Sequence, residues 1–119
     1  MKYFYEYEID NYIYYKIPKP LFADEKYKDM LPLAKVLYGI FLDRNSLSKA
    51  NGWIDDQGRV FFYYPIKEVM ALLNISNKTV TKLMDELEKY DLLWVYQQGL
   101  RKPNALYLGH FELSTSTNR

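Results

Sequence analysis

Polar and cationic side chains cluster between residues 76 and 82, and their chemistry suits contact with nucleic acid. Apolar residues at positions 80, 83, 84 and 87 follow the i, i+3, i+4, i+7 spacing of one helical face, which leaves the polar residues on the opposite face. Amide, hydroxyl and ammonium groups in the first turns of such a helix can meet base edges and phosphates in a major groove. We therefore expect double-stranded DNA as the partner, contacted by Ser76, Asn77, Lys78, Thr79, Thr81 and Lys82.

The roles of these residues differ by position. Asn77 and Lys78 are the predicted base readers, because they lie where a recognition helix meets base edges. Ser76 and Thr79 are the predicted phosphate anchors, and Ser76 is also a good N-cap for the free amides that follow it. These amides can themselves hold a phosphate.

The preceding segment predicts the first helix of a helix-turn-helix. Pro65 opens it, and the apolar positions 66, 69, 70 and 73 have helical spacing. Asn74 provides the residue tolerant of a left-handed backbone that the turn requires. Met70 stands where such motifs generally have a small side chain, which is a departure from the usual pattern.

A β-hairpin is predicted after the recognition helix. The runs 92–96 and 105–108 are strand-like, and they flank a loop that contains Gly99, Pro103 and two adjacent cations. This composition is typical of a wing that lies against a phosphate backbone or a narrow minor groove. Arg101, Lys102 and Asn104 are then expected to clamp the backbone, although the two cations also fit ordinary solvated loop charges.

The overall charge limits the strength of any DNA contact. The formal net charge of the chain is only +1, and residues 76–104 carry five cations and four anions. Lys78 and Lys82 begin the recognition helix, and we expect Asp85, Glu86 and Glu88 in its later turns to face away from phosphate. A weak net field predicts modest non-specific affinity, so tight binding needs base contacts, dimerisation or repeated sites.

Residues 1–22 form a tyrosine-rich N-terminal arm, with six of the 13 tyrosines placed before Lys16. Alternate positions from Tyr3 to Tyr7 are tyrosines, and this period of two predicts an extended strand. Two interpretations stay open: the aromatic residues cover the core of their own domain, or the arm pairs across a dimer, where tyrosine is favoured because it is half apolar. In the second case the dimer contacts are Tyr3, Tyr5, Tyr7, Tyr12 and Tyr14.

The fold class is α+β, a winged helix-turn-helix with three core helices, a small antiparallel sheet and a C-terminal β-hairpin wing. The supporting helix is predicted over residues 33–43, where Gly39 indicates close packing of another element. A small hairpin is expected between Trp53 and Tyr63. We assign residues 23–110 to the DNA-binding domain and residues 111–119 to a linker-like tail that leads to a C-terminal domain absent from this sequence.

Several function classes find no support in the sequence. There is no membrane span and no secretory signal, and the chain has no cysteine, so we expect a cytoplasmic protein without disulfides or cysteine zinc sites. His110 is the sole histidine, and we expect it to be structural or solvated. Phosphate loops, dinucleotide turns, nucleophile elbows and metal-ligand clusters are not found, which predicts no enzyme activity, no cofactor and no metal. The acidic pair Asp55-Asp56 is explained by a turn.

Five segments together resemble the N-terminal domain of the RepA_N family, the replication initiators of theta-replicating plasmids from low-GC Gram-positive bacteria. The resemblance covers nearly the whole chain and is more specific than a generic helix-turn-helix. Where family wings often carry several basic residues, this chain has Trp94–Gln98, which leaves fewer phosphate contacts. The segments that carry the resemblance are Tyr15–Phe22, Ala34–Gly39, Leu42–Asp55, Leu72–Asn74 and Gly99–Asn104.

The resemblance implies an initiator that binds repeated sites in a plasmid origin and recruits host replication proteins through its C-terminal domain. It also implies a homodimer, with pairing of two origin complexes as a brake on copy number. Two other classes stay open from the residues alone. One is a winged-helix transcriptional regulator, which also binds duplex DNA, and the other is a protein-protein assembly module without direct DNA binding.

Overall fold

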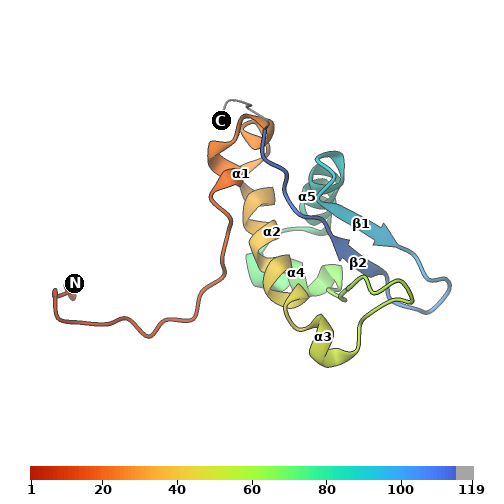
Figure 1. Cartoon of the computed structure of the whole chain (residues 1–119), viewed down its shortest axis with the longest axis horizontal. Helices are drawn as coiled ribbons and strands as arrows, with labels where there is room; N and C mark the ends of the chain where they lie inside the picture. Colours follow the sequence, from red (N-terminus) through yellow and green to blue (C-terminus); the bar gives the residue numbers. More distant parts are fainter. Residues whose placement is uncertain (115–119) are drawn as a thin grey trace.

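The structure, a computed structural model, describes residues 1–114 and shows a mainly helical body with a β-hairpin on one side (Figure 1). Within these residues, no helix combines the length and the apolar character needed to cross a membrane. The elements in chain order are α1 (Pro20–Ala23), the 3₁₀ turn η1 (Glu25–Tyr27), α2 (Pro32–Asn45), α3 (Ser48–Asn51), α4 (Ile66–Leu73), α5 (Asn77–Lys89), β1 (Leu93–Tyr96) and β2 (Ala105–Leu108).

Helix α2 runs through the middle of the body and confirms the predicted supporting helix. Pro32 occupies its first turn, where proline costs no hydrogen bond. The close packing predicted at Gly39 is also confirmed, because a Cβ at this position would lie 2.6 Å from the Cγ1 of Ile17 and 3.0 Å from the carbonyl oxygen of Lys16. Glycine therefore lets the end of the N-terminal arm lie directly on α2.

Helices α4 and α5 form the predicted helix-turn-helix. Pro65 is the N-cap of α4, and Asn74 ends this helix in the left-handed conformation, with φ 56° and ψ 52°. Met70 is half-buried against the core, so the turn closes here without a small side chain at that position. The apolar face of α5 is buried through Val80 and Leu83 as its spacing predicts, which leaves the polar face in solvent.

The wing hairpin is confirmed as an antiparallel pair in which Trp94 lies opposite Tyr107 and Val95 opposite Leu106. Phe62 extends this sheet by a single bridge, since its amide donates to the Leu106 carbonyl at 2.9 Å and its carbonyl accepts the Leu106 amide at 2.8 Å. The second hairpin, expected between residues 53 and 63, is reduced to one bridge between Ile54 and Val60. The Asp55 carboxylate there binds turn amides, which replaces strand pairing with turn geometry.

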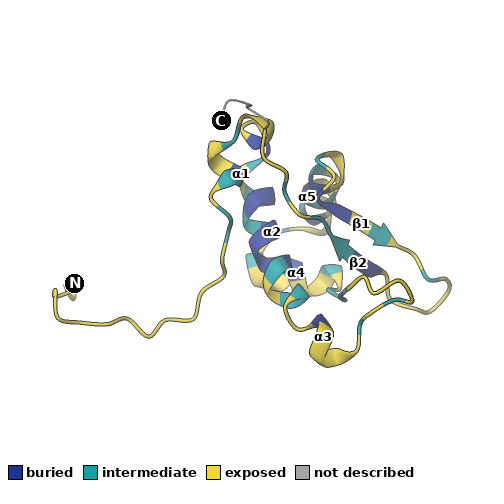
Figure 2. Cartoon of the chain, viewed as in Figure 1, coloured by how far each residue is buried: buried dark blue, intermediate teal, exposed yellow. Residues whose placement is uncertain are grey.

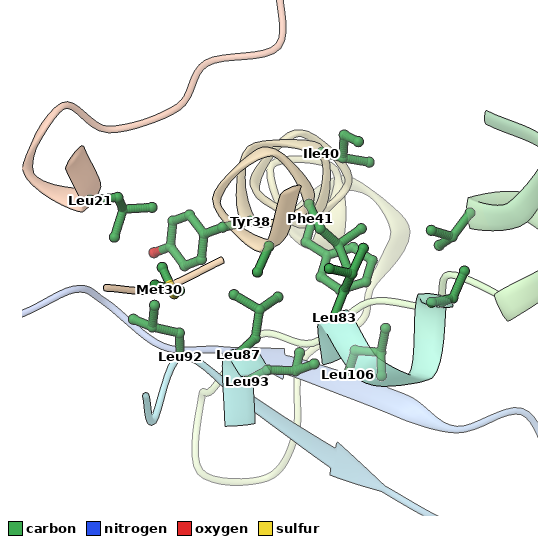
Figure 3. Close-up of a cluster of buried hydrophobic side chains, with 14 of the residues drawn as sticks. Leu21, Met30, Tyr38, Ile40, Phe41, Leu83, Leu87, Leu92, Leu93 and Leu106 are labelled. Atoms are coloured by element: carbon green, nitrogen blue, oxygen red, sulfur yellow. The ribbon is translucent and has the colours of Figure 1, made fainter. Parts of the chain in front are cut away.

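One hydrophobic core holds these elements together (Figure 3). Phe41 of α2 and Leu87 of α5 are fully buried, and Leu106 of β2 is 2% exposed. Because α5 is fixed by this shared core, its opposite face is held outward. The fold is α+β, a winged helix-turn-helix with α2, α4 and α5 as core helices and the β1–β2 hairpin as its wing.

Most of the N-terminal arm extends away from this body, and residues 1–16 are all exposed (Figure 2). Only its end meets α2, where Tyr14 and Lys16 line a hollow with Gly39. The interpretation that its aromatic residues cover the domain's own core is therefore wrong. The strand expected at Tyr3–Tyr7 does not form either. A turn replaces it, because the Tyr5 amide donates to the Glu8 carboxylate at 2.7 Å and the Glu8 amide donates to the Tyr5 carbonyl at 2.9 Å.

The segments before and after the predicted domain both contact the body. Ile17 packs on α2 and Leu21 is fully buried, so residues 17–22 of the predicted arm belong to the packed structure. At the other end, the Glu112 amide donates to the Tyr27 hydroxyl at 2.7 Å, and the Ser114 amide donates to Asp24 at 2.9 Å. The beginning of the linker-like tail is thus bound, while its residues 115–119 lie outside the described residues.

Candidate nucleic-acid interface

The start of α5 combines a side-chain cap with free backbone donors. Ser76 accepts the Thr79 amide at 3.1 Å, and the hydroxyl oxygens of these two residues are 3.0 Å apart. The predicted cap is confirmed. The first amide that donates within the helix is that of Val80, to the Ser76 carbonyl at 3.0 Å. The amides of Asn77 and Lys78 therefore stay available to an acceptor such as phosphate.

The polar face of α5 is exposed at every position predicted to meet DNA outside the cap. Asn77, Lys78, Thr81 and Lys82 are exposed, whereas Thr79 is half-buried. The Thr81 hydroxyl lies 3.4 Å from the Asn77 amide oxygen, which holds these two side chains together. Lys78, Thr81 and Lys82 also line one shallow hollow along the helix. The structure thus gathers the predicted residues on one continuous surface.

The acidic residues of α5 do not all point away from this surface. Asp85 and Glu86 line the same hollow as Lys78 and Lys82, so the expectation that they face away is wrong for these two. Asp85 shares a helix face with the two lysines, because residues three and seven positions apart lie on the same side of a helix. Glu86 also bonds to the body, where it accepts the Leu31 amide at 2.9 Å. The positive charge of this surface is therefore concentrated on the N-terminal half of α5.

The wing loop presents its cations on a braced backbone. Gly99 and Arg101 have positive φ values of 119° and 65°, and the Gln98 side chain donates to the Pro103 carbonyl at 2.7 Å. Arg101, Lys102 and Asn104 are all exposed. Ion pairs in the described part of the chain involve neither the wing cations nor Lys78 and Lys82. These four charges are therefore free for an external anion.

A groove of about 390 Å³ joins the wing to the helix-turn-helix. Lys102 and Asn104 line its wing side, and Met84 of α5 lines its helix side. Lys67, in the first turn of α4, lies in the same groove and is exposed. Lys67 was not predicted from the sequence, because only the tertiary packing brings it beside the wing. Lys67 of the helix-turn-helix and Lys102 of the wing therefore lie on one common surface.

The arm tyrosines are not part of this interface. Tyr3, Tyr5, Tyr7, Tyr12 and Tyr14 lie on an arm that leaves α2 and runs away from the wing hairpin (Figure 1). The only histidine, His110, is exposed beyond β2. Within residues 1–114, no group of three or more histidine, cysteine, aspartate or glutamate residues is arranged to hold a metal ion.

The one strongly perturbed carboxylate in the described part of the chain, that of Asp55, has a structural environment. Partial burial by itself raises the pKa of Asp55, but hydrogen bonds from the backbone and side chain of Arg59 lower it. With further hydrogen bonds from the Gln57 amide and the Tyr107 hydroxyl, the pKa falls to about 2. The Arg59 guanidinium donates to this carboxylate at 2.8 Å and Tyr107 donates at 3.0 Å. Asp55 thus ties the loop after α3 to β2.

Comparison with known proteins gives consistent matches. The family described as "Replication initiator protein A (RepA) N-terminus", RepA_N, matches residues 13–119. A protein of Lactobacillus helveticus described as "41 kDa protein" is 30% identical over 97 residues, which cover 82% of this chain. The matched part spans only 28% of that relative's length.

Three solved structures are also similar. One described as "N-Terminal domain of DNA binding protein" has a TM-score of 0.78 at 36% identity, with 96% of this chain and 87% of the other covered. A second, "Structure of Rep-DNA complex", has the same TM-score and identity, with 95% and 87% covered. A third, "Structure of MDR initiator", has a TM-score of 0.73 at 38% identity, with 86% and 80% covered.

Proposed function

The chain belongs to the RepA_N family, the N-terminus of replication initiator protein A, and from that premise we propose that it is the DNA-binding domain of a plasmid replication initiator. In this proposal α5 enters the major groove and binds repeated sites of the plasmid origin. Asn77 and Lys78 contact base edges, and Thr81 and Lys82 continue the contact along the helix. Ser76 and Thr79 contact the phosphate next to these bases.

The observation that carries this proposal is the surface on the N-terminal half of α5. Its cations have no ion-pair partner within residues 1–114, and its first amides are not used by the helix. The core is completed by the opposite face of the helix, so this surface stays available to an external partner. A phosphate backbone satisfies both the ammonium groups and the amides.

The wing supplies a second group of contacts to the phosphate backbone. Lys102 and Asn104 face Lys67 across the groove, so one strand of phosphates passing there meets cations from both sides. Arg101 adds a third cation from the loop, where its backbone is left-handed. These contacts hold the register of α5 on the duplex, since phosphate contacts position a protein and base contacts give it specificity.

The small net charge of +1 fits binding to repeats. A domain with a weak overall field has modest affinity for a single site, and several adjacent sites raise it by avidity. We accordingly propose a homodimer that uses the arm tyrosines, and pairing of two occupied origins as a brake on copy number. Host replication proteins are recruited elsewhere in the initiator, through a C-terminal domain that follows the tail.

The remaining assignments are part of the same proposal. The protein acts in the cytoplasm, without enzyme activity and without a cofactor. Residues 23–110 are the DNA-binding domain, with the arm before them and the linker-like tail after them. Asp55 has a structural role, because its oxygens bind four donors of the body and none of them belongs to a substrate site.

The proposal is tested with lysine variants and origin duplexes of the encoding plasmid. Lys78→Ala is expected to cost about 1–3 kcal/mol of binding free energy and to relax the preference at one base pair. Lys102→Ala is expected to weaken all sequences alike and to flatten the salt dependence by about one unit of slope. Lys49→Ala on α3 is the matched control and should change neither quantity. Unchanged affinity and preference in Lys78→Ala would show that α5 is oriented differently.

A further inference from the structure

The N-terminal arm exposes more apolar surface than a free segment in water favours. Ile13 is 100% exposed, Ile9 is 86% exposed and Tyr7 is 78% exposed. Contiguous exposed apolar surface of this kind marks a site of interaction. The arm is also fixed at its root, because Ile17 packs directly on Gly39 of α2. It is thus presented outward from a defined point.

The charges of the arm favour a protein surface over DNA as its partner. Glu6, Glu8 and Asp10 lie in the middle of the exposed residues 1–16, whereas the lysines of this segment, Lys2 and Lys16, lie at its ends. Three carboxylates at alternate positions repel a phosphate backbone. Tyrosine-rich surface with few cations is instead typical of protein-protein contacts.

The wing sheet has one open edge. Leu106 of β2 directs its amide and its carbonyl at Phe62, so these groups do not point toward β1. Its neighbour Val95 is therefore at a non-hydrogen-bonded position of the β1–β2 pair, and the Val95 amide and carbonyl point out of the sheet. Leu93, two residues away, has the same orientation. Within residues 1–114, no strand pairs with this outer edge of β1.

The outer face of this edge is aromatic. Trp94 and Tyr96 of β1 are 53% and 47% exposed, with ring centroids 5.6 Å apart. The Trp94 ring also lies 5.1 Å from that of Tyr107 on β2. An added strand would place its side chains beside these rings, where aromatic cross-strand pairs stabilise a sheet.

The arm contains a segment that matches this edge. After the turn at residues 5–8, residues 9–15 contain no helix and no turn, and Tyr12 and Tyr14 are two positions apart. In a strand these two side chains lie on the same face, with the spacing of Trp94 and Tyr96. Pairing would cover all four aromatic rings and would give the open amides and carbonyls of Val95 and Leu93 their partners.

We propose that residues 9–15 of one copy add as a strand to the outer edge of β1 in a second copy, with Tyr12 and Tyr14 packed beside Trp94 and Tyr96. This inference rests on the homodimer of the proposed function and specifies its contact. A reciprocal exchange of arms gives a closed twofold dimer. The donated strand lies on the edge of the wing sheet and makes no use of the exposed polar residues of α5.

Disulfide trapping tests this contact, because the chain has no cysteine of its own. Trp94 and Tyr96 lie at non-hydrogen-bonded positions relative to an added strand, where Cβ atoms are about 4.5–5.5 Å apart and close enough for a disulfide after small shifts. A Tyr12→Cys chain is mixed with a Tyr96→Cys chain of different mass and oxidised gently. The mixed disulfide can only form between two copies.

We expect the mixed disulfide to form at least tenfold faster than in a control mixture of Tyr12→Cys with Leu47→Cys, a cysteine at an exposed position beside α3. In a second measurement, Trp94→Asp should raise the dimer dissociation constant at least tenfold, and Tyr12→Asp should do the same. Leu47→Asp should leave this constant unchanged. Equal trapping rates, or a dimer that is insensitive to both Tyr12→Asp and Trp94→Asp, would overturn the proposal.

The same variants separate this inference from the DNA proposal. Tyr12→Asp is expected to keep the wild-type preference for a duplex with a single origin site, since α5 is intact. If trapping fails while this preference persists, the arm contact is wrong and the DNA proposal stands. If trapping succeeds but neither the wild type nor the variants prefer the origin site, the arm contact stands and the DNA proposal is wrong.

Discussion

The tyrosines of the body and those of the arm are the same residue type in opposite environments. Tyr27 and Tyr38 are 1% and 2% exposed, whereas Tyr3 and Tyr7 are 68% and 78% exposed. In the body, the Tyr27 hydroxyl accepts the Glu112 amide and the Tyr38 hydroxyl donates to the Gly109 carbonyl, both at 2.7 Å. Burial raises the pKa of Tyr38 to about 12.

This difference teaches that aromatic content alone does not locate a core. The body is complete without residues 1–16 of the arm, since one contiguous cluster already joins its helices to the wing. Tyrosines that contribute nothing to that cluster are available to a partner. The body therefore carries the stability of the monomer, and we propose that the arm serves association between copies. The experiments below compare substitutions in the two regions.

The largest contrast is expected from truncation of a tyrosine in each region. Tyr27→Ala removes a buried ring and should cost about 3–5 kcal/mol of unfolding free energy. Tyr7→Ala should change it by no more than about 0.5 kcal/mol, because its ring is exposed. Urea unfolding of dilute protein measures both values. Comparable losses for the two variants would show that the arm packs on its own body in solution.

Substitutions in the body and in the arm should also differ in their effect on DNA binding. Asn77→Ala on α5 is expected to cost about 1–3 kcal/mol of binding free energy for the cognate site and to relax the preference at one base pair. Tyr14→Ala in the arm should leave binding to a single-site duplex unchanged. Competition titrations with duplexes that differ at one base pair measure both effects. A loss of base preference in the arm variant would assign DNA contacts to the arm.

Removal of a single hydroxyl gives a smaller contrast. Tyr38→Phe deletes the hydrogen bond to the Gly109 carbonyl and should cost about 1 kcal/mol of unfolding free energy. Tyr3→Phe, the matched change in the arm, should have no measurable effect. Thermal and urea unfolding of the two variants test this. An unchanged stability in Tyr38→Phe would mean that water replaces the lost partner.

A further contrast depends on pH and concerns Asp55, the carboxylate that accepts a hydrogen bond from the half-exposed Tyr107. The pKa of Asp55 is lowered to about 2, so its ionised form is favoured by folding. Its contribution is complete above the unfolded pKa near 3.8 and is lost as the pH falls through about 2. Asp55→Asn should therefore be less stable than the wild type at neutral pH, and the difference should shrink as the pH falls toward 2 and below.

Asp56→Asn is the control for this pH series, because Asp56 is the exposed neighbour of Asp55. It should follow the wild-type stability at every pH. A difference between Asp55→Asn and the wild type that persists unchanged to pH 2 would assign the effect to lost packing and not to the charge.

The local features of the helix-turn-helix could be predicted from sequence because each depends on few residues. Asn74 ends α4 in a left-handed conformation, and Ser76 caps α5, as their side-chain chemistry requires. Gly39 was predicted to allow close packing, although the sequence did not say that Ile17 provides it. These features follow from backbone geometry and short-range hydrogen bonds.

Predictions that depended on more distant geometry were less successful. The alternation at Tyr3–Tyr7 predicted a strand, but a strand needs a neighbour, and the Glu8 side chain stabilises a turn instead. Asp85 was expected to face away from phosphate, yet the helical repeat places it in the same hollow as Lys78 and Lys82. Lys67 was missed because its closeness to the wing arises only from tertiary packing.

The most direct test of the central claim is fluorescence anisotropy of this chain with a duplex that carries the repeats of its plasmid origin, beside a scrambled duplex, across a salt series. We predict that the preference for the repeats persists at physiological salt, because base contacts by α5 are less sensitive to salt than phosphate contacts. Equal and steeply salt-sensitive binding to both duplexes, or no binding to either, would contradict sequence-specific recognition by this domain.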